Sequence, residues 1–109
     1  MTPTSRTLNK LRSEGWLPGI VEKYNSFSKK RFDLYGFVDV VAVRDNETIA
    51  IQSTSYSNIP SRVNKIKENA NYPILKQAWR IEVWGWQKKK RISKQGTVYY
   101  RYEPRIVQL

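Results

Sequence analysis

The residue with the most suggestive chemistry is Asp39, a single acid within the otherwise apolar segment Phe37–Val43. Because this segment is apolar on both alternating faces, it predicts a central strand that is covered on both sides. A buried carboxylate without a partner costs several kcal/mol, so a cation is expected beside it. Two answers stay open at this point: a bound metal ion, or a structural ion pair with one of the many arginines.

Further oxygen-bearing side chains occur before and after Asp39. Glu22 precedes it, and Thr48–Thr54 has strand composition, in which a period of two places Gln52 and Thr54 on one face. The chain has no histidine and no cysteine, which excludes Ser-His-Asp triads, histidine-based nuclease sites, thiolate nucleophiles and cysteine zinc sites. Metal chemistry in this chain would therefore use a hard ion, Mg²⁺ or Mn²⁺, on oxygen ligands.

The overall charge is strongly positive, with 20 lysines and arginines against 9 acidic residues and a net charge of +11. Such a surface attracts polyanions, and nucleic acid is the commonest of these because each neutralised phosphate releases a condensed counterion. Charge alone separates neither DNA from RNA nor binding from catalysis. An anionic membrane is a weaker candidate, because the sequence shows no basic amphipathic helix.

The length of 109 residues fits one domain, residues 1–109, and 39% hydrophobic residues predict that it folds around one core. No apolar stretch approaches the ~20 residues needed to span a bilayer, and the first residues lack the apolar core of a signal peptide. We therefore expect an intracellular, cytoplasmic protein with no membrane partner.

Hydrophobic patterning and turn residues predict an α/β protein, a mixed β-sheet flanked by helices, in the order αβββαββ. A helix is expected over Pro3–Glu14, an edge strand within Trp16–Tyr24 and an exposed loop over Ser26–Arg31. The remaining elements are a hairpin of Phe37–Val43 with Thr48–Thr54, a helix from Pro60 with an apolar stripe of Val63, Ile66 and Ala70 that ends before Pro73, and a hairpin of Arg80–Trp86 with Thr97–Tyr102.

The connection within the last hairpin is basic. Its cations are candidate phosphate contacts, which would position a nucleic acid without reading its sequence. They are Lys88, Lys89, Lys90, Arg91 and Lys94.

Aromatic residues lie close to this basic run, and they could stack unpaired bases or fill the core. Strand alternation predicts that Ile81 and Val83 face away from Trp84 and Trp86. We therefore expect at least one of these tryptophans to be a core residue.

Two consecutive segments carry a resemblance to a known family. Arg31–Val43, with the sequence RFDLYGFVDVVAV, and Ile49–Ser55, with the sequence IAIQSTS, resemble the active-site hairpin of PD-(D/E)XK nucleases. The likeness is greatest to archaeal-type Holliday-junction resolvases and small phage-encoded relatives, and it extends from about Trp16 to Lys65. It implies a restriction-endonuclease-like fold, Mg²⁺ or Mn²⁺ as cofactor and DNA as partner.

In that family an aspartate opens the motif and an acidic-x-lysine tripeptide lies on the next strand. Asp39 matches the aspartate, Gln52 the acidic position and Thr54 the lysine position, so QxT replaces (D/E)xK. Glu22, within Ile20–Lys23, is similar to the additional glutamate that often completes the metal site, although it could equally be a surface carboxylate.

Both departures from the motif weaken the implied chemistry. An amide oxygen can ligate a hard cation but adds no charge, and threonine cannot supply the lysine ammonium. Lys65 or Arg62, on the following helix, could supply the missing cation, or Lys65 could lie on a solvated face. Asp33 is either a further ligand or a capping residue of the turn at Tyr35 and Gly36.

Three functions follow from these observations. The first is a metal-dependent DNA endonuclease, acting on duplex or on branched DNA such as a Holliday junction, for which a homodimer would match the substrate's symmetry. The second is a catalytically inactive nucleic-acid-binding module that keeps the nuclease fold. The third is a basic RNA-associated protein of another fold, in which Asp39 is only an internal ion pair.

Overall fold

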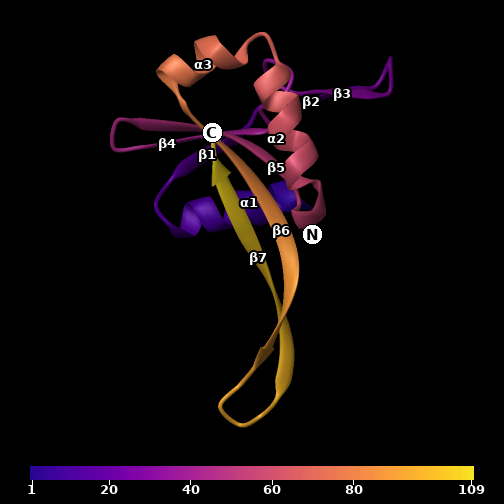
Figure 1. Cartoon of the computed structure of the whole chain (residues 1–109), viewed down its shortest axis with the longest axis vertical. Coiled ribbons are helices and arrows are strands. Elements are labelled where there is room, and N and C mark those ends of the chain that lie inside the picture. The colour runs from indigo at the N-terminus through magenta and orange to yellow at the C-terminus, as the bar shows by residue number, and fades with distance from the viewer.

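The computed structural model describes all 109 residues as a mixed five-stranded sheet, a separate two-stranded ribbon and three α-helices (Figure 1). The sheet order is β1-β4-β5-β6-β7, and only β5 and β6 run parallel. The elements are α1 (Pro3–Ser13), β1 (Leu17–Ile20), β2 (Lys23–Asn25), β3 (Lys30–Phe32), β4 (Val40–Arg44), β5 (Glu47–Ser55), a 3₁₀ turn (Tyr56–Asn58), α2 (Ile59–Glu68), α3 (Tyr72–Ala78), β6 (Arg80–Ile92) and β7 (Val98–Gln108).

This architecture confirms the predicted α/β class with a mixed, helix-flanked sheet. The first helix also agrees with its prediction, and its start has the expected chemistry. The Thr2 hydroxyl accepts a hydrogen bond of 3.1 Å from the Ser5 backbone N–H, and Pro3 occupies the first turn, where its missing donor costs nothing. The helix ends before Gly15, whose φ of +85° lies in the left-handed region that glycine tolerates.

Two hydrophobic clusters show that the sheet is the middle layer of three. On one face α1 packs Leu8 and Leu11 against Val40, Ala42, Ile49, Ile51, Trp84 and Trp86. On the other face α2 and α3 cover the sheet and contribute to a second cluster. That cluster consists of Phe37, Val38, Ala50, Ile59, Ile66, Leu75, Ile81 and Val83.

The alternation of β6 is therefore confirmed, with Ile81 and Val83 facing one helical layer and Trp84 and Trp86 facing the other. Both tryptophans are core residues, and both indole N–H groups have partners. Trp84 Nε1 donates to Glu82 Oε1 and Trp86 Nε1 donates to Thr7 Oγ1, each at 2.9 Å.

The first turn of α2 approaches β6 closely at Gly85. A Cβ atom at this position would lie 2.3 Å from Ile59 Cδ1, so only glycine admits this packing. Because β5 and β6 are parallel, the chain must cross over between them, and it does so through α2 and α3. The beginning of α2 is thereby held at the C-terminal end of β5.

Several predicted elements were wrong in detail. The expected loop Ser26–Arg31 is the turn and one strand of the β2–β3 ribbon, in which Tyr24 pairs with Arg31. The edge strand is shorter than predicted, since β1 covers only Leu17–Ile20. The central strand also starts later, at Val40, because Phe37 lies in the turn before it.

The C-terminal half differs in two ways. The predicted stop at Pro73 is the start of α3, where proline occupies the first turn, and Ala70 lies outside α2. In addition, β6 continues through the basic run to Ile92, so that the element order is αβββββααββ. Neither α3 nor the β2–β3 ribbon has a strong periodic pattern of its own.

The extension of β6 and β7 forms a long twisted hairpin that projects away from the three layers (Figure 1). We call residues 87–103 of this hairpin the arm. Lysines 88–90 are exposed, as expected for a segment that extends beyond the core.

No helix combines the length and apolar character that crossing a membrane would require.

Candidate functional site

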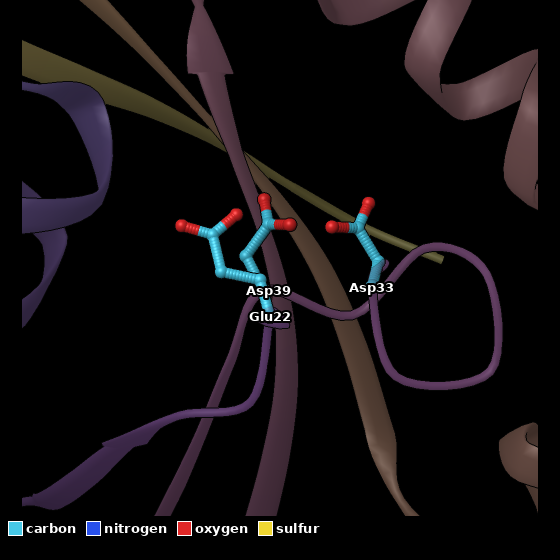
Figure 2. A group of neighbouring side chains, drawn as sticks. All are labelled: Glu22, Asp33 and Asp39. Carbon is cyan, nitrogen blue, oxygen red and sulfur yellow. The ribbon is translucent and has the colours of Figure 1, made fainter. Parts of the chain in front are cut away.

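Three carboxylates converge at one end of the sheet: those of Glu22, Asp33 and Asp39 (Figure 2). One oxygen of each lies within 4.8 Å of the others. The three residues come from different segments, because Glu22 lies between β1 and β2, Asp33 follows β3 and Asp39 precedes β4. The sequence-based set of acidic candidates is thus brought together in space.

Asp39 is held by main-chain hydrogen bonds to both neighbouring segments. Its N–H donates to the Ile51 carbonyl and its carbonyl accepts from the Val21 N–H, each at 2.9 Å. Its carboxylate Oδ2 accepts from the Ser53 backbone N–H at 2.9 Å. The side chain is therefore fixed in position, and the residue is only 5% exposed.

The environment of Asp39 disfavours its charged form. Burial is the largest cause that raises the pKa, and the negative charges of Asp33 and Glu22 raise it further, whereas the hydrogen bond from Ser53 lowers it. The net result is a pKa of about 7. None of the ion pairs in the molecule includes Asp39, so the alternative of an arginine-neutralised acid is wrong.

Asp33 has the expected structural role at the turn, through its main-chain carbonyl, and its role as a further ligand stays a prediction. Its carbonyl accepts from the Gly36 N–H at 3.0 Å, which closes a turn in which Tyr35 and Gly36 have φ values of +55° and +89°. Leu34 and Val38 pair across this turn, which returns the chain so that Asp33 faces Asp39. The carboxylate of Asp33 remains free to join the cluster.

Glu22 is half-buried rather than an ordinary surface carboxylate. Its Oε1 lies 3.8 Å from Nη1 of Arg31, which is exposed on the neighbouring strand of the ribbon. This separation is long for a charge-assisted hydrogen bond, so Arg31 compensates only part of the negative charge of the cluster.

The carboxylates form part of the wall of a cleft of about 700 Å³, which the starts of α1 and α2 also line. Gln52 and Thr54 project from β5 into the same cleft, as the period of two predicted. Gln52 is only 3% exposed, and its Oε1 has no hydrogen-bond partner. A buried acceptor without a partner is costly, and the lining of a cleft is where a ligand would satisfy it.

The cations of the cleft differ in part from those expected. Arg62 lines it from the second turn of α2, but Lys65 is exposed and lies outside the lining. The position along the helix explains the difference. The start of α2 meets the cleft, and Lys65 lies about one turn further along the helix than Arg62, next to the core residue Ile66. Of the two cations that the sequence offered for this role, only Arg62 therefore lines the cleft.

Sequence reasoning missed Arg31, which also lines the cleft. Its position depends on the β2–β3 ribbon, and short polar strands of this kind carry no hydrophobic alternation that would reveal them. The basic residues of the arm, Lys88–Arg91 and Lys94, lie outside the lining of the cleft.

No family model matches the chain, and no curated protein or solved structure is significantly similar to it. Function is therefore inferred from the chemistry of the site.

Proposed function

We propose that this protein is a metal-dependent DNA endonuclease of the PD-(D/E)XK type, with a restriction-endonuclease-like fold. The observation that carries the proposal is the unpartnered Oε1 of Gln52, buried in the cleft that contains Glu22, Asp33 and Asp39. The strand arrangement supports it, because Asp39 precedes one strand of an antiparallel pair and Gln52 lies on the other.

The donor set fits a hard divalent cation. Glu22, Asp33, Asp39 and Gln52 offer only oxygen atoms, which Mg²⁺ and Mn²⁺ prefer. Burial is the main cause of the raised pKa of Asp39, and repulsion by the carboxylates of Asp33 and Glu22, which a bound cation would relieve, adds to it. When bound, such an ion stabilises charge on a phosphate and acidifies a water molecule that can attack it.

The side chains of this protein would hold and orient the DNA. Arg62 and Arg31 lie where a phosphate entering the cleft could contact a guanidinium, which can donate two parallel hydrogen bonds. The Thr54 hydroxyl can donate only one hydrogen bond and brings no charge. We therefore assign the phosphate-stabilising role of the motif lysine to Arg62.

The net charge of +11 supports a nucleic acid as the partner, since it attracts polyanions, and the choice of DNA comes from the sequence resemblance. Branched DNA, such as a Holliday junction, is the substrate that the sequence resemblance suggests. A two-fold symmetric junction would be matched by a homodimer, which would present two such clefts.

The second candidate function is a binding module that keeps this fold without cutting DNA. One observation favours it: the acidic and lysine positions of the motif are Gln52 and Thr54, so a negative ligand and a cation are both replaced. Such a module would retain the basic surface but would not hydrolyse phosphodiesters.

One experiment separates these candidates. Purified protein is incubated with a labelled duplex, a four-way junction and a single-stranded RNA, in Mg²⁺, in Mn²⁺ and in EDTA. An endonuclease gives DNA products in the metal reactions only, whereas a binding module gives shifted but intact DNA in all of them. Intact DNA in every reaction would overturn the proposal, and preferential binding of the RNA would favour an RNA-associated protein.

We expect Arg62→Ala to lower the rate of DNA cleavage by about 10- to 100-fold, because it removes a charge-assisted contact to the phosphate. Lys65→Ala is the matched control, since it removes a cation from the exposed side of the same helix and should leave the rate within about threefold. Single-turnover cleavage of a duplex measures both. Equal effects of the two substitutions would contradict the assignment of Arg62.

A further inference from the structure

The arm has two chemically different faces. Residues paired directly across an antiparallel ribbon point to the same side, and the side alternates with each pair. One face therefore carries the pairs Lys88–Tyr102, Lys90–Tyr100 and Ile92–Val98. The other carries Gln87–Glu103, Lys89–Arg101 and Arg91–Tyr99. We call the first of these the aromatic face.

The aromatic face is exposed although it is rich in apolar groups. Tyr100 is 58% exposed, Tyr102 47% and Ile92 67%, because the hairpin extends away from the helices (Figure 1). Exposed apolar side chains that lie together on a projecting ribbon indicate a surface with a partner.

Cations alternate with the tyrosines of this face. The Lys88 Nζ lies 4.8 Å from the ring centroid of Tyr100, and the Arg6 guanidinium carbon lies 3.4 Å from that of Tyr102. Aromatic rings beside positive charges suit a ligand that has flat π-systems joined by anions, which is the chemistry of a single nucleic-acid strand.

Arg6 connects the aromatic face to one wall of the cleft. Arg6 lies on α1, directly after residues Thr2 to Ser5, which line the cleft. The arm also begins where β5 ends, since Ser55 pairs with Trp86. A strand that follows the tyrosines past Arg6 therefore leads towards the carboxylates at the end of β5.

The opposite face lacks this combination. Its aromatic residue, Tyr99, has Arg91 as its cross-strand neighbour, and the guanidinium of Arg91 forms an ion pair with Glu103. Part of the positive charge on this side is thereby neutralised, and the remaining Lys89 and Arg101 can attract phosphates without stacking bases.

We propose that the aromatic face of the arm binds single-stranded DNA by stacking unpaired bases on Tyr100 and Tyr102. This binding mode also determines the substrate, an inference that rests on the proposed function. The nuclease would act where an unpaired strand adjoins a duplex, as in a flap or a branched junction. The arm holds the unpaired strand and directs the adjoining phosphate to the cleft.

The test compares two adjacent tyrosines on opposite faces. Binding of a fluorescent oligothymidine and of a duplex of equal length is measured by anisotropy in EDTA, which prevents cleavage. We expect Tyr100→Ala to weaken oligothymidine binding about tenfold and duplex binding less than about twofold, since stacking requires unpaired bases. Tyr99→Ala should change neither by more than about twofold, and Tyr100→Trp should restore oligothymidine binding.

Several outcomes would overturn the inference. Equal losses for Tyr100→Ala and Tyr99→Ala, or an equal loss of duplex binding, would show that the arm contributes charge only. If sedimentation shows a wild-type dimer that Tyr100→Ala dissociates while oligothymidine affinity is unchanged, the aromatic face contacts a second copy of the chain instead.

The two proposals fail separately in these experiments. If Tyr100→Ala binds oligothymidine in EDTA as tightly as the wild type, the arm does not bind the unpaired strand. The proposed endonuclease would still cut a plain duplex in Mg²⁺. Conversely, a protein that never cuts DNA could still bind oligothymidine through Tyr100. Thermal melting of each variant tests whether the three packed layers, which do not include the arm, remain folded.

Discussion

Asp39→Asn should abolish metal-dependent cleavage of DNA and at the same time stabilise the metal-free protein near neutral pH. The loss of cleavage should reach roughly a thousandfold or more, since a bound ion contributes several kcal/mol to the transition state and Asp39 is the most buried of the carboxylates proposed to hold it. Asparagine keeps the shape of the side chain and can still accept the hydrogen bond from Ser53. The measurements are single-turnover cleavage and thermal unfolding.

The stability effect follows from the raised pKa of Asp39, which changes from an ordinary value of 3.8 to about 7 in the folded protein. Between these values the folded state retains a proton that the unfolded state has lost, so wild-type stability falls as the pH rises through this range. The cost is on the order of a few kcal/mol once Asp39 is ionised. In EDTA, the advantage of Asp39→Asn should therefore grow from about pH 4 to about pH 7 and stay constant above it.

Asp45→Asn is the matched control, because it makes the same chemical change at an exposed turn. It should alter neither cleavage nor the pH dependence of unfolding. Added Mn²⁺ should stabilise the wild type near pH 8 and have little effect on Asp39→Asn. A variant that is destabilised at that pH and still cuts DNA would mean that Asp39 serves only the fold.

Strong local patterns made the centre of the site predictable. The apolar segment around Asp39 and the alternation of β5 were sufficient to place Asp39, Gln52 and Thr54 at one end of the sheet. Gln52 and Thr54 lie in β5 and Asp39 directly precedes β4, and both strands contain core residues, so that a one-residue shift of register would bury polar groups and expose apolar ones. The burial of both faces of the central strands therefore made the position of these site residues predictable, together with the strands themselves.

The parts of the site that were not predictable depend on weak local signals. The role of Asp33 requires positive φ angles at Tyr35 and Gly36, and only glycine adopts these without cost. Arg31 reaches the cleft through a ribbon of three-residue strands that no core supports. The choice of Arg62 over Lys65 depends on where α2 begins, and helix boundaries are the least certain element of any sequence-based prediction.

Gln52→Glu should tighten Mn²⁺ and Mg²⁺ binding by about tenfold or more and destabilise the metal-free protein. A fourth carboxylate increases the electrostatic attraction for a divalent cation, whereas without a cation it adds a like charge to the three that already repel each other. The substitution also introduces the acidic residue that the proposed PD-(D/E)XK motif has at this position. Calorimetric titration with Mn²⁺ and thermal unfolding in EDTA measure the two effects.

The opposite signs of these effects distinguish a metal centre from a merely polar cleft. Gln77→Glu, which makes the same change on the exposed side of α3, should alter neither metal affinity nor stability appreciably. If Gln52→Glu binds Mn²⁺ no more tightly than the wild type, the buried Oε1 does not face a cation and the donor set must be revised. If affinity rises but cleavage does not, positive charge rather than metal occupancy limits the reaction, because Thr54 still occupies the position where the proposed motif has a lysine ammonium.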